Sequence, residues 1–188
     1  VLCLPDDAAR ESAAMAASAG SLDHPFWNFS LAVYAAPGVA DECLALQESC
    51  GVDVNVLLFC AWLASVRKVA VTHGDIEAIA AVVGAWHESA VKPLRGVRRY
   101  MKTMPGGEVA LLRTRVKGAE LEAEQIEQAM LFAHAEAHWT RAGQGALPAA
   151  LHSNLETYLR AQGYRGPGGD ALPLRSLCAA VKALPAAS

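Results

Sequence analysis

The sequence predicts an all-α fold, a single-domain bundle of about seven helices with one long helix in the C-terminal half of the chain. Apolar residues recur at helical spacings, Gly and Pro interrupt them at short intervals, and no run shows the alternation of a half-buried strand. The 188 residues, 53% hydrophobic and 19% charged, are enough for one domain with its own core. No repeat of fixed period indicates a solenoid.

The first expected helix follows a segment of different composition. Residues 1–21 are rich in Ala, Ser and Asp and poor in large apolar groups. We therefore expect a loosely docked N-terminal segment, followed by a single helical domain over residues 22–188. From Asp23, an acidic cap candidate and a proline near the start predict a helix that ends at Pro37-Gly38.

Two further helices are expected between residues 39 and 68. The first has acidic residues in its first turn, where the helix dipole favours anions, and it ends at Gly51. Asp53 can cap the second, which is apolar on every side. Such a helix in a soluble protein is surrounded by other helices. Its eleven uncharged residues from Val56 to Val66 are too few to span a bilayer.

The middle of the chain predicts a helix that contains a proline. Thr72 to Asp75 introduces apolar residues at helical spacing, and Pro93 should kink or restart the helix. The sequence Pro105-Gly106-Gly107 then makes a clear break.

The long helix is predicted over residues 108–139, with Gly118 as a candidate interruption. Its exposed side is expected to be strongly acidic, and Glu120 and Glu124 are expected to face water. Two shorter helices follow, the first of them ended by Gly163.

The cysteines and the N-terminal sequence indicate in which cellular compartment the protein is expected. Five cysteines without a C-x-x-C pair argue against a disulfide framework and against a zinc ribbon. The N-terminus does not resemble a secretory signal, so a cytoplasmic location without membrane contact is the expectation.

The strongest compositional signal is basic. Eight of the sixteen basic residues lie between positions 92 and 117, where Glu108 is the only acid. Four of them recur at helical spacings and could offer one face to phosphate or carboxylate oxygens; they are Arg95, Arg98, Arg99 and Lys102. Alternatively, the cations form a solvated face or pair with the acids of the next helix; these acids are Glu120, Glu122, Glu124 and Glu127. The net charge of −3 disfavours nucleic acid.

A metal site is not predicted. His134 and His138 stand four residues apart, a spacing that suits zinc. However, the acid between them is Glu136, on a different helical face, and no third ligand is marked. We therefore expect no metal and no cofactor, with this histidine pair as the alternative. No nucleophile elbow, phosphate loop or dinucleotide motif occurs.

Several apolar and amide side chains are candidates for a core or for a ligand pocket. The aromatic residues have the spacing of a core and could also surround an apolar ligand; they are Phe26, Trp27, Phe29, Tyr34, Phe59 and Trp62. Asn55 and Gln47 lie in mostly apolar surroundings, where a buried amide needs partners. Both are expected to cap or cross-link helices, or else to orient a ligand.

Two segments and Trp86 also resemble the sequence of a known family. The segment FWNFSLAVYAAPGVADECLALQESCGVDVNVLLFCAWL, followed by Trp86 and KPLRGVRR, is similar to an uncharacterised, mainly proteobacterial family of small proteins. The resemblance covers Pro25 to Leu131. It implies a helical fold and brings no activity, cofactor or catalytic residue with it.

The function is not identified by the sequence, and three hypotheses remain open. The first is a soluble, non-enzymatic binding or adaptor protein that engages a protein partner or an anionic ligand through the basic region. The second is a small helical enzyme or cofactor-binding protein, with an apolar pocket near Asn55 and Trp62 and arginines that hold an acidic substrate. Arginines clustered at a pocket mouth would favour the second hypothesis, and arginines spread over a convex surface would favour the first. The third is a homo-oligomer that associates through the long helix.

Overall fold

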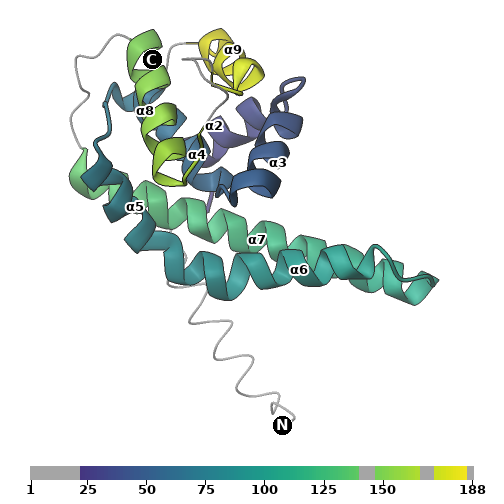
Figure 1. Ribbon diagram of the computed structural model, residues 1–188. Coiled ribbons are helices and arrows are strands. Elements are labelled where there is room, and N and C mark those ends of the chain that lie inside the picture. The colour runs from purple at the N-terminus through teal and green to yellow at the C-terminus, as the bar shows by residue number, and fades with distance from the viewer. Residues whose placement is uncertain (1–21, 140–146, 166–171, 186–188) are drawn as a thin grey trace.

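The computed structural model describes residues 22–139, 147–165 and 172–185, and over these ranges it contains helices and no strand (Figure 1). The segment 1–21, expected to be loosely docked, lies outside them. The elements are α2 (Pro25–Tyr34), α3 (Val39–Cys50), α4 (Val54–Trp62), η1 (Leu63–Arg67), α5 (His73–Trp86), η2 (His87–Val91), α6 (Lys92–Met101), α7 (Gly107–His138), α8 (Leu147–Ala161) and α9 (Arg175–Ala183).

The all-α prediction is confirmed. Because α4 continues into η1 and α5 continues through η2 into α6, the described ranges contain seven continuous helical rods. The long helix is also confirmed, and it passes through Gly118 without a break. The described helices share a hydrophobic core, whereas the division into a segment and a single domain stays a prediction.

The core is built around α4. Every residue from Asn55 to Trp62 is buried, and α4 contacts α2, α3, α7 and α8. The ring centroids of Phe26 and Phe59 lie 5.2 Å apart, and those of Phe59 and Trp62 lie 5.8 Å apart. The apolar helix is therefore the centre of the helical packing, as its composition predicted.

Local signals set most of the helix ends. The Asp53 side chain accepts a hydrogen bond from the Asn55 backbone N–H at the start of α4, and Thr72 and Asp75 form a capping box at the start of α5. Gly51 has the left-handed φ of 66° expected of a helix-ending glycine. At α2, however, the N-cap is His24 rather than the acid beside it, and its Nδ1 accepts from the Trp27 backbone N–H.

The proline in the second long rod coincides with a π-helical turn. Pro93 has no N–H and its ring would clash with a carbonyl one turn earlier in a regular α-helix. The turn η2 widens the helix just before it, with the Lys92 N–H bonded to the His87 carbonyl. The helix then continues as α6, so that the rod accommodates Pro93 through the π-helical turn before it.

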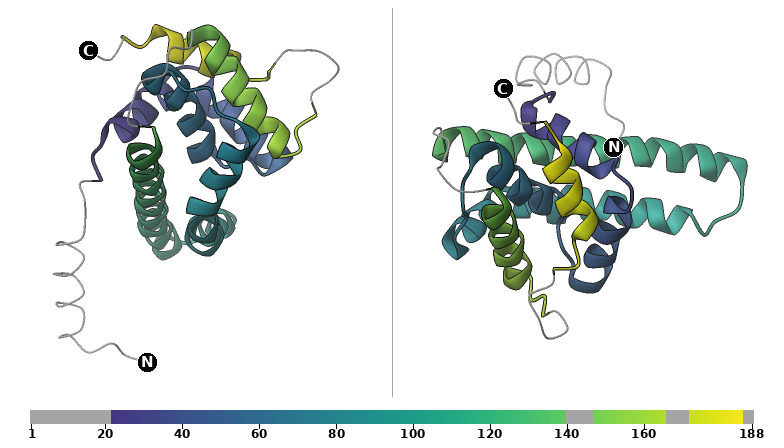
Figure 2. Two further views of the ribbon diagram at one scale, coloured as in Figure 1. Left: turned by 90° about the vertical axis from the view of Figure 1, so that its left-hand side faces the viewer. Right: turned by 90° about the horizontal axis from the view of Figure 1, so that it is seen from above.

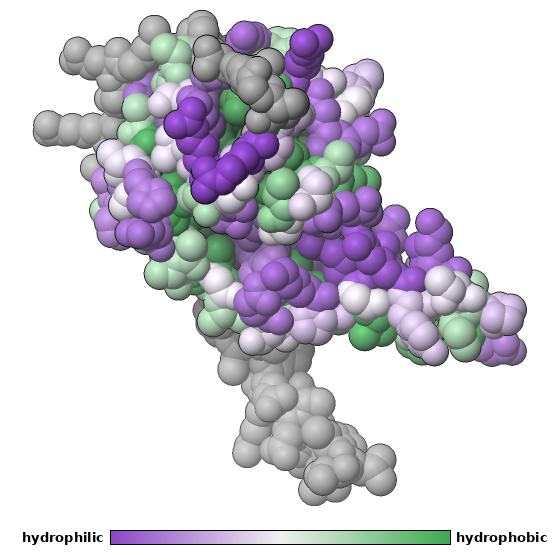
Figure 3. All heavy atoms as spheres, viewed as in Figure 1, coloured by the Kyte–Doolittle hydropathy of each residue, from purple (hydrophilic) through white to green (hydrophobic). Residues whose placement is uncertain are grey.

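The helices α6 and α7 run antiparallel, side by side, and their connected ends project from the rest of the helices (Figures 1 and 2). We call residues 92–119 the arm. None of the described helical residues in the arm is buried. Hydrophobic patches lie among hydrophilic residues along its surface (Figure 3).

The expectation that Glu120 and Glu124 face water is wrong. Glu120 is 5% exposed, and the Glu124 side chain is 27% exposed and paired with Arg95. Glu127 on the same helix is buried, at 0% exposure. The reason is that the cationic partners of these acids approach from α6 and η2, and paired charges can be buried.

Two other expectations concern cysteines and membranes. The described cysteines, Cys43, Cys50, Cys60 and Cys178, are free thiols. Burial raises the pKa of the Cys43 thiol to about 12, which suits an unreactive core residue.

Among the described helices, none by itself has the length and apolarity to cross a membrane. The helices α2 and α3, bent by 98°, meet the criteria of length and composition only as a pair.

Candidate functional site

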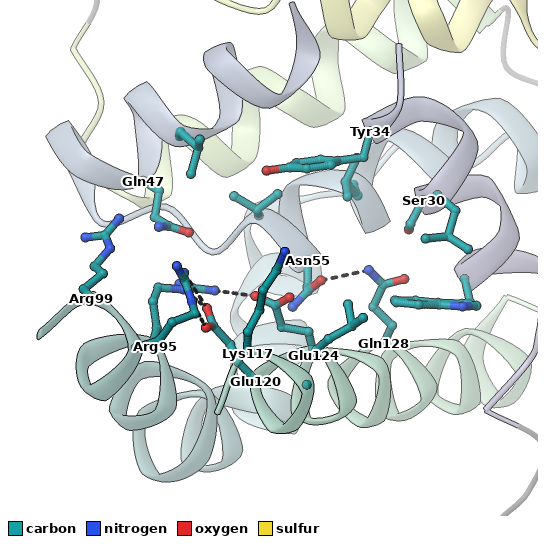
Figure 4. A pocket seen from close by; sticks show the side chains of 18 of the residues that line it. Ser30, Tyr34, Gln47, Asn55, Arg95, Arg99, Lys117, Glu120, Glu124 and Gln128 are labelled. Carbon is teal, nitrogen blue, oxygen red and sulfur yellow. Dashed lines mark hydrogen bonds and ion pairs between the residues drawn. The ribbon is translucent and has the colours of Figure 1, made fainter. Parts of the chain in front are cut away.

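A cavity of about 520 Å³ lies where α2, α3 and α4 face the antiparallel pair α6 and α7 (Figure 4). It brings together residues that are up to 101 positions apart in the chain. Its lining residues are Trp27, Ser30, Leu31, Tyr34, Leu44, Gln47, Val54, Asn55, Leu58, Arg95, Arg98, Arg99, Thr114, Lys117, Gly118, Glu120, Leu121, Glu124 and Gln128.

Two arginines on one wall are held by carboxylates. Arg95 donates from Nε to Glu120 Oε1 at 3.2 Å and from Nη2 to Glu124 Oε1 at 2.6 Å. Arg98 donates to both oxygens of Glu120. Burial alone would raise the pKa of Glu120, but Arg98 and Arg95 outweigh it and hold the pKa below its ordinary value. Arg95 and Arg98 therefore pair with acids of the next helix, which was the alternative expected for the basic residues.

Two further cations are available to a ligand. Among the described residues, Arg99 makes one long contact of 3.4 Å to Glu48, and both side chains are exposed. Lys117 has no ion-pair partner among the described residues, and its amine points from α7 toward the middle of the cavity (Figure 4). Four cations against the carboxylates of Glu120 and Glu124 leave the lining with an excess of positive charge.

Part of the cavity lining is exposed and apolar. Large apolar side chains that are each at least 37% exposed line it; they are Leu31, Tyr34, Leu44 and Leu121. Isolated exposed leucines are ordinary, but several around one concave site are typical of a binding surface.

The floor of the cavity carries a chain of amides. Asn55 on α4 donates from Nδ2 to Glu127 Oε2 at 2.5 Å, and Gln128 on α7 donates from Nε2 to Asn55 Oδ1 at 2.8 Å. Asn55 therefore cross-links two helices, as expected. The side chains of Asn55 and Gln128 line the cavity, whereas Glu127 lies behind them.

Glu127 belongs to a buried ionic cluster. His87 Nδ1 lies 2.9 Å from Glu127 Oε1 and 3.0 Å from Asp53 Oδ2, so one N–H is shared between two carboxylates. Burial would lower the pKa of His87, but the hydrogen bonds to Asp53 and Glu127 outweigh it and raise the pKa to about 9. Burial also raises the pKa of Glu127, against the effect of His87. At neutral pH the cluster is held by an imidazolium.

The same three residues are the group in the described ranges that could hold a metal ion. One ligand atom from each of Asp53, His87 and Glu127 lies within 4.8 Å of the others. However, the proton on His87 Nδ1 stands where a cation would bind, and metal binding requires its removal. The alternative pair, His134 and His138, has ring centroids 4.1 Å apart, but His138 Nδ1 donates to the His134 carbonyl instead of facing a shared ion.

The structure brings together only part of the residues predicted to bind. Arg95, Arg98, Arg99 and Asn55 line the cavity. By contrast, Trp62 is fully buried in the core, and Lys102 is exposed at the end of α6; neither lines the cavity. The expected pocket around Asn55 therefore lies beside Trp27 and not beside Trp62.

Several lining residues were missed by sequence reasoning. A stripe on α7 that faces the cavity had a readable signal, because its spacings of four, three and four residues mark one helical face; it comprises Lys117, Leu121, Glu124 and Gln128. His87, which lies in the buried cluster and does not line the cavity, had no such signal, because its partners come from distant parts of the chain.

Comparison with known proteins places this architecture in a family. A family model described as a protein of unknown function (DUF2390) matches residues 25–131, which is more than half of the chain and includes every residue that lines the cavity. No curated protein and no solved structure matches the chain. The chain therefore belongs to the DUF2390 family, whose function is unknown.

Proposed function

We propose that the protein binds a small anionic molecule with an apolar body in the cavity between α2–α4 and α6–α7. The observation that carries the proposal is the position of the arginines. Arg95, Arg98 and Arg99 line a cavity together with exposed apolar side chains instead of spreading over a convex surface. That arrangement favours the hypothesis of arginines that hold an acidic ligand.

The charge of the lining suits an anion. Glu120 and Glu124 fix the guanidinium groups of Arg95 and Arg98, so these groups need little ordering when a ligand arrives. Arg99 and Lys117 supply the charge that these carboxylates do not offset. A carboxylate or phosphate between them would accept charge-assisted hydrogen bonds.

The size and the apolar surface suit a small molecule. A volume of about 520 Å³ lies within the range of small-molecule pockets, roughly 300–1,000 Å³. The exposed faces of Leu31, Leu44 and Leu121 would lose contact with water against an acyl chain or a ring system.

Dodecanoate, a carboxylate with an apolar chain, provides a direct test by isothermal titration calorimetry. We predict one site per chain, and a loss of affinity of at least tenfold in Lys117→Glu, because the reversal places a negative charge inside the cavity. The matched control is Arg115→Glu, which makes the same charge change on the same helix two residues away, outside the lining. Equal affinities in the two variants, or no binding to the wild type, would contradict the proposal.

The same control separates a ligand site from an adaptor surface. An acidic protein partner that docks on the arm would use the cations outside the cavity, which include Lys102 and Arg115. Its affinity would fall in Arg115→Glu, whereas that of a cavity ligand would not. The arm favours this second function through its exposed apolar side chains, of which Leu111 is 67% exposed.

A further inference from the structure

Two polar atoms in the cavity lining have no hydrogen-bond partner among the described residues. They are Ser30 Oγ and Gln128 Oε1, and both side chains are 3% exposed. Buried polar atoms are paired in the great majority of native structures, so an unpaired one calls for an explanation. The indole nitrogen of Trp62 is also unpaired, but that residue does not line the cavity.

The orientation of the Gln128 amide is fixed by the charged cluster behind it. Glu127 accepts from His87 at one oxygen and from Asn55 at the other, so Asn55 must turn its NH₂ group toward the carboxylate. The Asn55 carbonyl then faces Gln128 and accepts from its NH₂ group. The carbonyl oxygen of Gln128 is left unpaired, and because it can only accept, it needs a group that donates a hydrogen bond.

The two unpaired atoms and two of the arginines lie at opposite ends of the cavity. In Figure 4, Ser30 and Gln128 are at one end, Arg95 and Arg99 are at the other, and Lys117 lies between them. A ligand that fills the cavity therefore meets positive charge at one end and a hydrogen-bond acceptor at the other.

We infer that the ligand carries a hydrogen-bond donor, such as a hydroxyl group, at the end remote from its anionic group. This inference rests on the proposed function and narrows the ligand class to hydroxylated apolar acids. The donor would bind Gln128 Oε1, and Ser30 Oγ can accept from or donate to the same group. A ligand without the donor would fill the cavity and leave both atoms unpaired, which disfavours its binding.

The test compares pairs of fatty acids that differ by one hydroxyl group. The probes are ω-hydroxy acids of eight, ten and twelve carbons and the unsubstituted acids of the same lengths, titrated by calorimetry. At the length that spans the cavity, we predict that wild-type protein prefers the hydroxy acid by about tenfold, the effect of one well-formed hydrogen bond. Gln128→Met removes the acceptor at similar volume and should reverse the preference, since the hydroxyl group would then be buried without a partner.

Controls separate this result from a general loss of structure. Gln125→Met makes the same replacement on the same helix outside the lining, where Gln125 donates to the Leu22 carbonyl, and it should keep the wild-type preference. Ser30→Ala leaves the amide chain intact and should reduce the preference, so it provides the test if Gln128→Met does not fold.

The outcomes distinguish the inference from the proposed function. The inference is overturned if wild-type protein binds each unsubstituted acid at least as tightly as its hydroxy partner, while Lys117→Glu still weakens binding; a water molecule would then satisfy the two atoms. If no acid of either kind binds, the proposed function itself fails.

Discussion

At the scale of single residues, the shared proton of His87 orders the floor of the cavity. His87 Nδ1, which carries this proton, lies 3.0 Å from Asp53 Oδ2 and 2.9 Å from Glu127 Oε1. Both carboxylates would otherwise repel each other in a site from which water is largely excluded. Through Glu127, the same proton fixes the orientation of the Asn55 and Gln128 amides.

This cluster predicts a fall in stability at alkaline pH. Because the folded pKa of His87 is about 9, above its ordinary value of 6.5, the stabilisation is complete below about pH 6.5 and is lost as the pH rises through 9. We expect the free energy of unfolding, measured by urea denaturation, to fall by on the order of 2 kcal/mol across this window.

A matched pair of variants tests whether His87 causes this fall in stability. His87→Gln, which cannot carry the charge, should lose most of the pH dependence between 6.5 and 9. His73→Gln replaces an exposed histidine on α5 that pairs with the exposed Glu77, and this variant should retain the pH dependence. A wild-type protein equally stable at pH 6.5 and pH 9 would show that His87 is not charged in the folded state.

Sequence reasoning identified the polar residues with a local cause and missed those without one. Asp53 was predictable as a cap because it directly precedes an apolar helix, and Asn55 because an amide among apolar residues needs partners. Glu127 was expected to be one of the acids that pair with the basic region, because it lies in an acid-rich helix. Its burial depends on His87, 40 residues away, which no helical spacing relates to it.

At the scale of elements, the π-helical end of the α4 rod depends on one buried amide from α8. Asn154 accepts from the Val71 N–H at 2.8 Å and donates to the carbonyls of Cys60 and Val69 at 3.1 and 2.9 Å. It thereby satisfies backbone groups where the rod ends and the chain turns, at Lys68 with its left-handed φ of 57°.

Removal of this amide should destabilise the protein strongly. Asn154→Ala removes all three of these hydrogen bonds at once and leaves the buried Val71 N–H without its side-chain partner. We expect a loss of about 3 kcal/mol in the free energy of unfolding, measured by chemical denaturation. His152→Ala, an exposed position on the same helix, should change it by less than about 0.5 kcal/mol. A similar small effect for both variants would mean that water replaces the Asn154 contacts.

The elements themselves were largely predictable, because their signals are local. The capping box at Thr72, the glycine at Gly51 and the helix irregularity beside Pro93 each arise within a few residues. Which helices pack against each other was harder to predict. In α6 and α7, Arg95 and Arg98 reach the carboxylates of Glu124 and Glu120 because a short turn lets the two helices run antiparallel.

At the scale of the whole molecule, charge is divided between the arm and the rest of the chain. Residues 92–117 carry eight basic residues and one acid, although the net charge of the chain is −3. The cavity lies at the base of the arm, where its cations meet the apolar surfaces of α2, α3 and α4. An anion would be attracted toward the arm by this field before it reaches the cavity.

The basic stretch was visible in the sequence, but the cavity was not. Helical spacing showed that arginines share a face, whereas the concave surface arises only where five helices meet. The same lack of tertiary information led to the inclusion of Trp62 and Lys102 among the binding residues, although one is in the core and the other lies outside the cavity.

A crystal structure of the protein with dodecanoate tests the central claim most directly. We predict that the carboxylate lies within about 3 Å of the Arg99 guanidinium or the Lys117 amine, with the acyl chain between Leu58 and Leu121. A structure with dodecanoate at saturating concentration in which the cavity contains only water, or in which the fatty acid lies on the arm beside Leu111, would contradict the account.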